Sequence, residues 1–490
     1  MTWPVVVMWI LLFAGLVLPG PLPLLYLFFS LGAFASLNLI PNDSFTLLPQ
    51  MACAALLVLK ILLSRGQLSR AFDAAIDPSR LGLLFAYLAY GLFSSYVMPR
   101  FFAHVVEVVP MTAKVPWPVP LVPTGGNINQ SALTTLSVGV VLVITLAGEN
   151  AVFRRHSMLA LWIGGIVLFA TGIADMTMPE SLLEPFRNAY VLLVDVQVYG
   201  VKRVVGLTPE ASAFGPLCVA AAASLTFLRP CYENVRLRNL FVPLTILGLL
   251  TMAALSTSSS AYLGLAAFAM VFVVNWVRRA LSSDAPAREG LKWEVAFALF
   301  AGLAVLAVVV LMPHALDSTY DLIDGTIFKK MDTTSYVERT GWTTAALHAF
   351  FATDGLGVGI GSARTSDWFV SVLSNTGIIG AVFLSCFFLR LFFLRSRSED
   401  SRITEFITGL KFSLLPWFVT MAVSATTSDF GLGTAATLGL LASFAPKSGT
   451  TSIKSKAALT RQAQDRGRPG RLSAKGASGS HALTQRPTRR

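Results

Sequence analysis

The chain alternates between long apolar blocks and short polar connections. Most apolar blocks run for about 17 to 25 residues, the length of helix that crosses the hydrocarbon core of a bilayer. Pro19, Gly20 and Pro21 separate the first two blocks, which form either a tight hairpin or one broken element. The pattern predicts an all-α polytopic integral membrane protein with about 12–13 transmembrane helices and large periplasmic loops. The predicted spans are 3–19, 21–40, 46–64, 80–98, 131–148, 158–174, 212–228, 239–256, 259–277, 294–312, 368–394, 404–427 and 430–446.

Composition supports the same class. The chain is 54% hydrophobic and 13% charged, whereas soluble domains carry about 25% charged residues. The first apolar block lacks a basic flank and continues through Pro19 into the next block, so we do not expect a removable signal peptide. The four cysteines are scattered without a CxxC spacing, which gives no support to a disulfide or metal framework.

The positive charges determine the expected orientation. The net charge is +12, and much of the excess lies after Pro446, in a tail that has a single acidic residue, Asp465. A basic tail beside a bilayer fixes topology or contacts anionic lipid more often than it binds nucleic acid. Alternate connections carry most of the other cations, and the positive-inside rule places them in the cytoplasm. These cations are Arg65, Arg70, Arg80, Arg154, Arg155, Arg229, Arg236, Arg238, Arg278, Arg279, Arg288, Lys292, Arg395, Arg397 and Arg402.

Three long connections then fall on the outer side, and we leave the side of the N-terminus open. Long loops inside a compact fold are usually functional or disordered, and these are rich in aromatic and aliphatic residues. The predicted organisation is transmembrane helices in 1–98, 131–174, 212–312 and 368–446, periplasmic loops in 99–130, 175–211 and 313–367, and a disordered basic cytoplasmic tail in 447–490.

The third loop concentrates charge around a glycine run. Glu338 and Arg339 open a segment of helical period, and the alternating Gly357, Gly359 and Gly361 follow it. Such glycines let the backbone approach a ligand or another backbone closely, or they form a flexible turn. No strand precedes them, so they are not a dinucleotide fingerprint.

Arg364 and Asp367 lie within one turn of the next predicted helix start. The free N–H groups there favour an anion, although Asp367 has the simpler interpretation of an N-cap. The predicted spans hold essentially no ionisable residue at their centres, which argues against a proton- or sodium-driven transporter.

The second loop holds Arg203 and Glu210. Arg203 lies near the end of an amphipathic run from Tyr190 to Val205, where a guanidinium could hold a phosphate or pyrophosphate. It could equally cap its own helix, pair with Glu210, or rest on lipid headgroups. The few histidines lack metal-ligand spacing, and no Ser-His-Asp or HExxH pattern supports a hydrolase.

Together these segments resemble the O-antigen polymerase/O-antigen ligase superfamily of bacterial inner-membrane glycosyltransferases. The residues that carry the resemblance are Arg339 and Trp342, then Gly357-Val358-Gly359-Ile360-Gly361, Leu373 with Gly377-Ile378-Ile379-Gly380, and Arg203 with Gly206 and Pro209-Glu210-Ala211-Ser212. The resemblance implies sugar transfer on the periplasmic face from undecaprenyl-pyrophosphate-linked glycan, without a nucleotide sugar, a metal or another cofactor. It assigns the pyrophosphate to Arg203 and Arg339, with Arg364 and the three alternating glycines as further substrate contacts.

One departure from the ligase pattern is informative. The ligases carry a His-Asn pair where this chain has Ser366-Asp367, so the ligase histidine is missing. This favours an inverting polymerase of exopolysaccharide, capsule or O-antigen, and it leaves Glu338, Asp367 and Glu210 as candidates for the general base. The alternatives are a ligase, a lipid-linked oligosaccharide flippase or transporter, and a structural assembly partner. The expected partners are the lipid-linked glycan and the bilayer, with a chain-length regulator left open and no nucleic acid.

Overall fold

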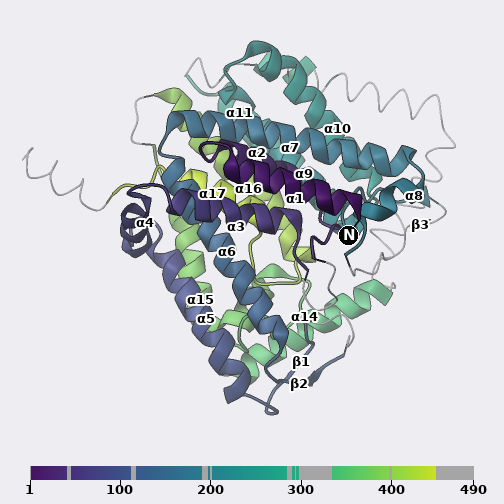
Figure 1. The fold of residues 1–490 in the computed structure, drawn as a ribbon, viewed down its shortest axis with the longest axis vertical. Coiled ribbons are helices and arrows are strands. Elements are labelled where there is room, and N and C mark those ends of the chain that lie inside the picture. The colour runs from purple at the N-terminus through teal and green to yellow at the C-terminus, as the bar shows by residue number, and fades with distance from the viewer. Residues whose placement is uncertain are drawn as a thin grey trace, which may run out of the picture. The chain divides into compact units, whose positions relative to one another are not determined.

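The structure is a computed structural model in which helices make up almost all of the described secondary structure (Figure 1). It describes residues 2–40, 46–111, 117–189, 197–198, 201–283, several positions between 288 and 299, 334–396 and 400–447. Residues Met1–Ala445 form one compact unit and Pro446–Arg490 a second, so the predicted basic tail lies almost wholly outside the described residues.

The first half of the chain contains α1 (Trp3–Val17), α2 (Leu22–Leu31), α3 (Pro49–Leu62), α4 (Gln67–Ile76), α5 (Gly82–Phe101), α6 (Gly125–Ala147), α7 (Ala151–Thr177), α8 (Glu180–Leu183) and η1 (Glu184–Phe186). The second half contains α9 (Ala211–Leu228), η2 (Arg229–Cys231), η3 (Leu237–Phe241), α10 (Val242–Leu255), α11 (Ser259–Ala280), α14 (Thr334–Ala352), α15 (Trp368–Phe392), α16 (Ser401–Ser424) and α17 (Leu432–Ala442). Two short antiparallel pairs join β1 (Glu107–Val108) to β2 (Val119–Pro120) and β3 (Gln197–Val198) to β4 (Val201–Lys202).

Many of these helices are long enough to cross a membrane. Within the described residues, eight pass on length and apolar character, or nine if the bent pair α3 and α4 forms one broken span. The eight are α5, α6, α7, α9 with η2, η3 with α10, α11, α15 and α16. Three shorter apolar helices, α1, α2 and α17, lie where further spans were predicted, and most of the predicted span 294–312 is outside the described residues. The chain is therefore a multi-pass helical membrane protein, as the sequence pattern predicts.

The first two helices form a hairpin, because they pack against one another. A side chain added at Gly15 in α1 would stand 2.8 Å from Leu24 in α2. Lys60 of α3 donates hydrogen bonds to the carbonyls of Gly15 and Leu16, each at 2.9 Å, and so satisfies the carbonyls at the end of α1. Of the two arrangements left open for Pro19–Pro21, the structure has the hairpin.

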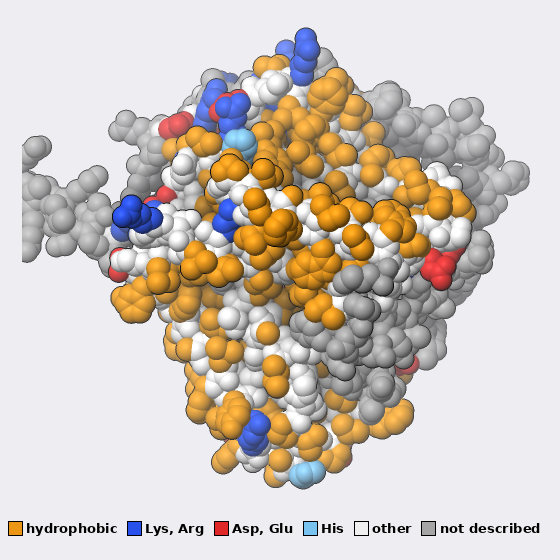
Figure 2. Space-filling view, in the orientation of Figure 1, with side chains coloured by type: hydrophobic (Ala, Val, Ile, Leu, Met, Phe, Trp, Pro, Cys, Tyr) orange, Lys and Arg blue, Asp and Glu red, His pale blue; other side chains and the backbone are white. Residues whose placement is uncertain are grey.

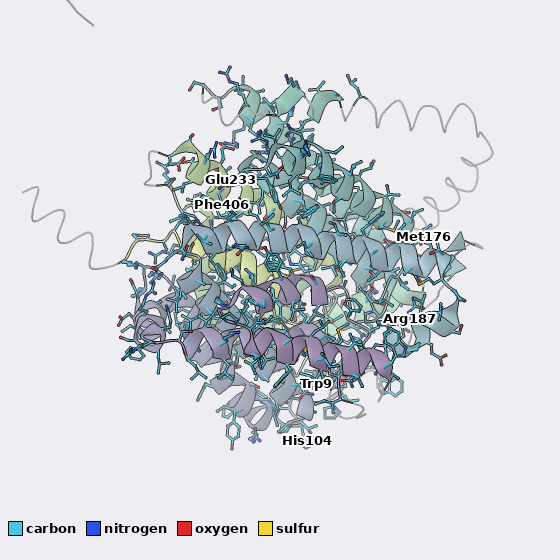
Figure 3. The ribbon with its side chains drawn as sticks, turned by 45° about the horizontal axis from the view of Figure 1, so that its top comes forward. Trp9, His104, Met176, Arg187, Glu233 and Phe406 are labelled. Carbon is cyan, nitrogen blue, oxygen red and sulfur yellow. The ribbon has the colours of Figure 1, made fainter. Side chains whose placement is uncertain are left out.

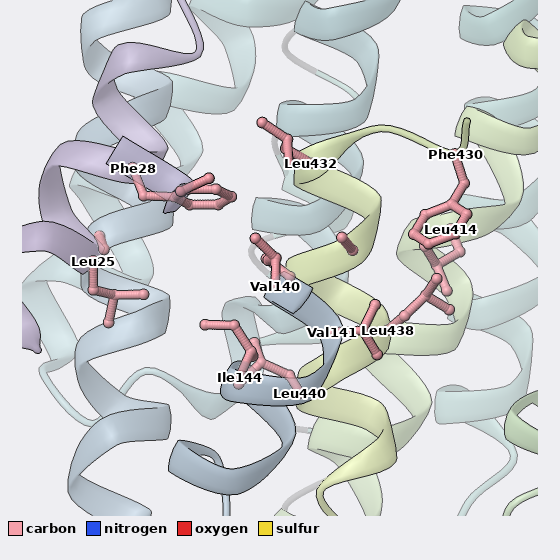
Figure 4. Packing of buried hydrophobic residues seen from close by; sticks show 14 of the residues in the cluster. Leu25, Phe28, Val140, Val141, Ile144, Leu414, Phe430, Leu432, Leu438 and Leu440 are labelled. Atoms are coloured by element: carbon pink, nitrogen blue, oxygen red, sulfur yellow. The ribbon is translucent and has the colours of Figure 1, made fainter. Parts of the chain in front are cut away.

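The central core is apolar and closely packed (Figure 4). Val140, Val141 and Ile144 of α6 face α17, where Leu438 and Leu440 are buried. The backbones approach closely because Gly439 of α17 has no side chain; a Cβ there would stand 2.7 Å from Cβ of Ile144. Small residues at helix contacts are the usual means of close packing inside a membrane, where lipid removes much of the hydrophobic driving force.

Ion pairs lie at both ends of the helices. Figure 3 shows Met176 and Arg187 at one end, and Glu233 and Phe406 at the other. Arg155, in the first turn of α7, pairs with Glu233 at 3.1 Å at the end where α7 begins, and Arg187 pairs with Asp175 at 2.8 Å at the opposite end. Lys and Arg side chains gather at the margin of the surface around a broad hydrophobic middle (Figure 2).

The N-terminus lies at the end where α7 finishes, opposite the Arg155–Glu233 pair. The Thr2 hydroxyl donates to the carbonyl of Pro185 at 3.2 Å, and the Trp3 and Phe186 rings meet edge to face with centroids 5.1 Å apart. Residues 184–187 follow α7 and the short α8, so the start of the chain lies beside the connection predicted as the second outer loop.

Candidate functional site

The site is built on the connection between α14 and α15. The predicted helical segment is confirmed: α14 runs to Ala352 and buries Trp342, Ala346 and Ala349. The predicted break is also confirmed, since Asp354 and Gly355 take positive φ values of 50° and 78° and turn the chain away from the helix. The connection then runs from 353 to 367 and lies near β1 and β2 (Figure 1).

The connection docks into a break within α15. Gly377 has φ 61° and ψ −174°, which is not helical, so the backbone bond from Ile378 N to Ser374 O is interrupted. The glycine run supplies both missing partners: Ile378 N donates to Gly355 O at 2.8 Å, and Val358 N donates to Ser374 O at 2.8 Å. Broken helix is tolerated at membrane depth where other protein groups satisfy the freed polar atoms.

The alternating glycines are points of close backbone approach. Gly357, Gly359 and Gly361 all have positive φ, and a Cβ at each would stand 2.5, 2.8 and 2.4 Å from backbone atoms of α15, α5 and α6 respectively. No other residue fits there without a shift. The approach to another backbone, one of the interpretations from sequence, is confirmed, and a contact of these glycines with substrate stays a prediction.

Two buried asparagines fix the connection. The sequence analysis placed Asn127 in the first outer loop and gave no role to Asn375. Asn127 Nδ2 in α6 donates to Ile360 O at 2.9 Å and to Ser362 Oγ at 2.8 Å. Asn375 in α15 accepts from Ala363 N at 3.1 Å and donates to Ala363 O at 3.0 Å. Their exposures of 5% and 1% show that these amides serve the interior. An asparagine within an apolar block could have indicated such a contact from the sequence, because a buried amide must find hydrogen-bond partners.

Arg364 emerges from this fixed backbone. Its N–H donates to Val109 O at 2.8 Å, and its guanidinium carbon lies 3.9 Å from the centroid of the Trp342 ring. The pKa of Arg364 lies below its ordinary value, mainly because the side chain is buried. Among the neighbouring charges, Glu210 and Glu338 raise this pKa and Arg339 lowers it. An arginine stacked on tryptophan gains about 0.5–2 kcal/mol and keeps its edge donors in a fixed plane.

The structure thus brings together four of the predicted site residues. Glu210 comes from the second long connection, Glu338 and Arg339 from α14, and Arg364 from the glycine connection. Within the described residues, neither Arg339 nor Arg364 makes an ion pair. Glu338 is exposed, whereas Glu210 is half-buried and accepts a hydrogen bond from the Ser212 hydroxyl. Arg364 therefore has a second cation and two carboxylates from distant segments within electrostatic reach.

Asp367 is the N-cap of α15. Its Oδ1 accepts from Phe369 N at 2.8 Å and Val370 N at 3.1 Å, which satisfies two of the N–H groups that a helix start leaves without partners. The N-cap interpretation is confirmed. A role of Asp367 as a base stays a prediction, and it would have to be combined with this cap.

Arg203 precedes α9 in the chain, and its guanidinium binds the turn between α10 and α11. Its Nε donates to Thr257 Oγ1 at 3.2 Å and its NH2 group donates to Thr257 O at 3.4 Å. Most of the predicted amphipathic run 190–205 lies outside the described residues, and the described part forms β3 and β4 instead of continuous helix, because 197–198 and 201–202 pair as strands.

Asp175 holds the segment that follows Arg203. Its Oδ2 accepts from Val205 N at 2.8 Å and Gly206 N at 3.1 Å, and its Oδ1 pairs with Arg187 at 2.8 Å. Asp175 is wholly buried, and Lys202 Nζ lies 3.6 Å from the same Oδ1, so two cations balance this buried carboxylate. The Arg203 segment is therefore fixed to the end of α7.

An apolar groove of about 500 Å³ runs along α15. It begins at Trp368, four residues after Arg364 in the sequence, and extends along the helix to Phe392. The lining residues are Trp368, Phe369, Val372, Leu373, Ala381, Leu384, Ser385, Phe388, Leu389, Phe392 and Phe418. A long hydrocarbon chain is the ligand chemistry that such a lining accommodates.

Comparison with known proteins gives no family: no protein-family model matches the chain, and no curated protein matches it in sequence. Within the described residues, no group of three or more His, Cys, Asp or Glu side chains has the arrangement of a metal site.

Proposed function

We propose that the protein polymerises undecaprenyl-pyrophosphate-linked oligosaccharide repeat units into exopolysaccharide, capsule or O-antigen at the periplasmic face of the bacterial inner membrane. The observation that supports this most is Arg364, stacked on Trp342 and within electrostatic reach of Arg339, Glu210 and Glu338. An apolar groove follows along α15. A lipid pyrophosphate has the matching chemistry, with two anionic phosphates on a long apolar chain. The proposal also rests on the family resemblance of these segments.

In the reaction, the acceptor hydroxyl attacks the anomeric carbon of the donor sugar. The bond between that carbon and the pyrophosphate oxygen breaks, the new glycosidic bond forms with inversion, and undecaprenyl pyrophosphate leaves. Arg364 and Arg339 stabilise the charge that grows on the leaving group, because fixed guanidinium donors in a site with little water act strongly on developing charge. The stack on Trp342 holds the fork of Arg364 in place before the reaction.

Glu210 is the candidate base that the geometry favours among Glu338, Asp367 and Glu210. A base must reach the hydroxyl proton, and its carboxylate should be partly shielded from water. Glu210 is half-buried and close enough to Arg364 to affect its pKa. Glu338 is exposed, and Asp367 is engaged as the helix cap. In this proposal Glu210 takes the acceptor proton while Arg203, on the nearby second connection, binds substrate phosphate.

The isoprenoid chain of the donor would lie in the groove along α15. The groove starts at Trp368, four residues after Arg364 in the sequence, and the proposal requires that one donor molecule fill both the groove and the arginine cluster. The proposed topology has about 12–13 spans, a cytoplasmic C-terminal tail, and an N-terminus on the periplasmic side, since Thr2 contacts Pro185. A chain-length regulator is a further proposed partner.

The proposal is tested by deleting the gene and restoring it as Arg339→Ala. We expect both strains to accumulate single lipid-linked repeats that have reached the periplasm, while the wild-type chain restores long polymer. Lipid-linked glycans extracted from each strain and separated by size give the answer. Normal polymer in the deletion strain would refute the proposal.

Two other results would point elsewhere. Long polymer that stays unattached to its acceptor would identify a ligase. Repeats that remain on the cytoplasmic side of the membrane would identify a flippase or transporter.

A further inference from the structure

The short helix α4 carries an exposed row of bulky apolar side chains. Leu68, Phe72 and Ile76 are spaced four residues apart, so they lie along one side of the helix, and they are 69, 65 and 59% exposed. Ala71 and Ala74, on another side, are buried where α4 contacts α5 and α6. Single exposed apolar residues are ordinary on a protein surface, whereas a contiguous row of them marks an interaction surface.

The remaining side of α4 is charged. Asp73 is exposed, and it points about 100° away from Phe72 around the helix axis. Arg70 pairs with Glu149 at 2.7 Å and is itself partly exposed. A helix with exposed charges at its middle is costly to place inside hydrocarbon, and water is unfavourable for the apolar row. The boundary between hydrocarbon and water satisfies both sides of the helix.

α4 is held at the level where several long helices end. Glu149, the partner of Arg70, lies between α6 and α7, and Arg390 in the last turn of α15 donates to the carbonyl of Pro78, just after α4. The axis of α4 also turns by 106° from that of α3. If α3 runs across the membrane, α4 therefore runs nearly parallel to its surface, at the margin of the molecule (Figure 1).

We propose that α4 is an in-plane helix of the membrane surface, with its apolar row packed among lipid acyl chains and Asp73 in the hydrated headgroup region. Leu59 and Leu63, at the end of α3, are also exposed, so the lipid-facing surface of the span continues onto α4. Segment 65–77 has two arginines and two aspartates and thus no net charge to select anionic headgroups. The occupant is therefore the apolar part of the bilayer.

The alternative arrangement makes α4 the second half of one broken span that begins with α3. The two arrangements differ in the depth of the apolar row. An in-plane helix keeps Leu68, Phe72 and Ile76 at one depth, whereas a helix that continues across the bilayer separates Leu68 from Ile76 by about 12 Å, at 1.5 Å per residue. The in-plane arrangement does not depend on the proposed polymerase activity.

The test measures this depth by electron paramagnetic resonance in the full-length protein, reconstituted into phosphatidylcholine liposomes. Leu68→Cys, Phe72→Cys and Ile76→Cys each receive a spin label in a Cys386→Ser background, which removes the exposed native thiol. We expect all three labels to collide more often with oxygen, which concentrates in hydrocarbon, than with a water-soluble nickel chelate, and to report the same depth. Asp73→Cys is the matched control and should favour the nickel chelate, because it adjoins Phe72 on the charged side.

The four labelled positions are exposed, so the labels leave the packing of α4 intact. A depth that changes by about 12 Å between Leu68→Cys and Ile76→Cys would overturn the proposal in favour of a broken span. Preference for nickel at all four positions would place α4 in water. Poor access of both reagents to the apolar row would show that protein covers it. A row that enters the bilayer only when phosphatidylglycerol is added would assign the surface to anionic headgroups instead.

Discussion

At the scale of single residues, Arg364 matters most for the proposed chemistry, because its backbone and side chain are both fixed. Val109 binds its N–H and Trp342 supports its guanidinium. Lysine would keep the charge but lose the flat fork and the stack. The difference between the two side chains can therefore be measured while the charge stays constant.

We expect Arg364→Lys to lower polymer synthesis by at least about tenfold, which corresponds to ~1.4 kcal/mol of lost transition-state stabilisation. The measurement is polymer yield per cell at matched protein level. Arg100→Lys is the control, since Arg100 also stacks on an aromatic ring, with its guanidinium carbon 4.0 Å from the Tyr96 centroid, but belongs to a different helix. Equal losses in both variants would show that the effect is not specific to the cluster.

Asp367 allows its structural role to be separated from a chemical one. We expect Asp367→Asn to keep both stability and polymer synthesis, because asparagine also caps a helix, and Asp367→Ala to lose about 1 kcal/mol of stability. Thermal unfolding in detergent measures the loss, and Asp400→Ala, which removes the corresponding cap of α16, provides the scale. Folded Asp367→Asn protein without activity would instead make Asp367 the base.

At the scale of elements, the glycine connection and the broken α15 act as one unit. The loop supplies hydrogen bonds that the helix lacks at Gly377, and the close backbone contacts leave no room for side chains. The arginine cluster depends on this unit for its position. Substituting the glycines should therefore change the geometry of the cluster without changing its charges.

Gly361→Ala should therefore destabilise the protein and reduce polymer synthesis. A Cβ there would stand 2.4 Å from the carbonyl oxygen of Gly126, in addition to the cost of φ +83°. Gly66→Ala has nearly the same φ, +74°, with nothing within 4 Å, so it isolates the conformational cost of about 1 kcal/mol. The prediction is a clearly larger fall in Tm for Gly361→Ala, and equal falls would contradict the packing role.

Local pattern was enough for some of these elements and not for others. The phase of α14, its end before Asp354 and the cap at Asp367 all depend on neighbouring residues, and the sequence predicted them. The two acceptors of the Asn127 amide nitrogen, Ile360 and Ser362, lie more than 200 residues away, so no local pattern indicates them. Hydropathy placed Asp429 between spans because a charge interrupts an apolar block, although the turn folds into the interior.

At the scale of the whole molecule, the segments that lie at each end of the helices predict the orientation of the protein in the membrane. Residues 180–187 and the N-terminus share one end, and the ion pair of Arg155 with Glu233 marks the other. The orientation inferred from positive charge places the first end outside the cytoplasm. This is open to direct labelling, since exposed positions exist at both ends.

We expect Ser181→Cys to react with a membrane-impermeant maleimide in intact cells and Glu233→Cys to react only after lysis. Both positions are exposed, and a Cys386→Ser background removes the exposed native thiol. The reverse labelling pattern would show that the protein has the opposite orientation, with the arginine cluster on the side where lipid-linked repeats are assembled.

The most direct measurement is chain growth by the purified protein in liposomes that contain the lipid-pyrophosphate-linked repeat unit. Nucleotide sugars are omitted and EDTA is present. The wild-type protein should lengthen the glycan and release one undecaprenyl pyrophosphate for each new linkage, while Arg364→Ala should do neither. Liposomes in which the wild-type protein leaves every repeat single would contradict the proposed polymerase activity.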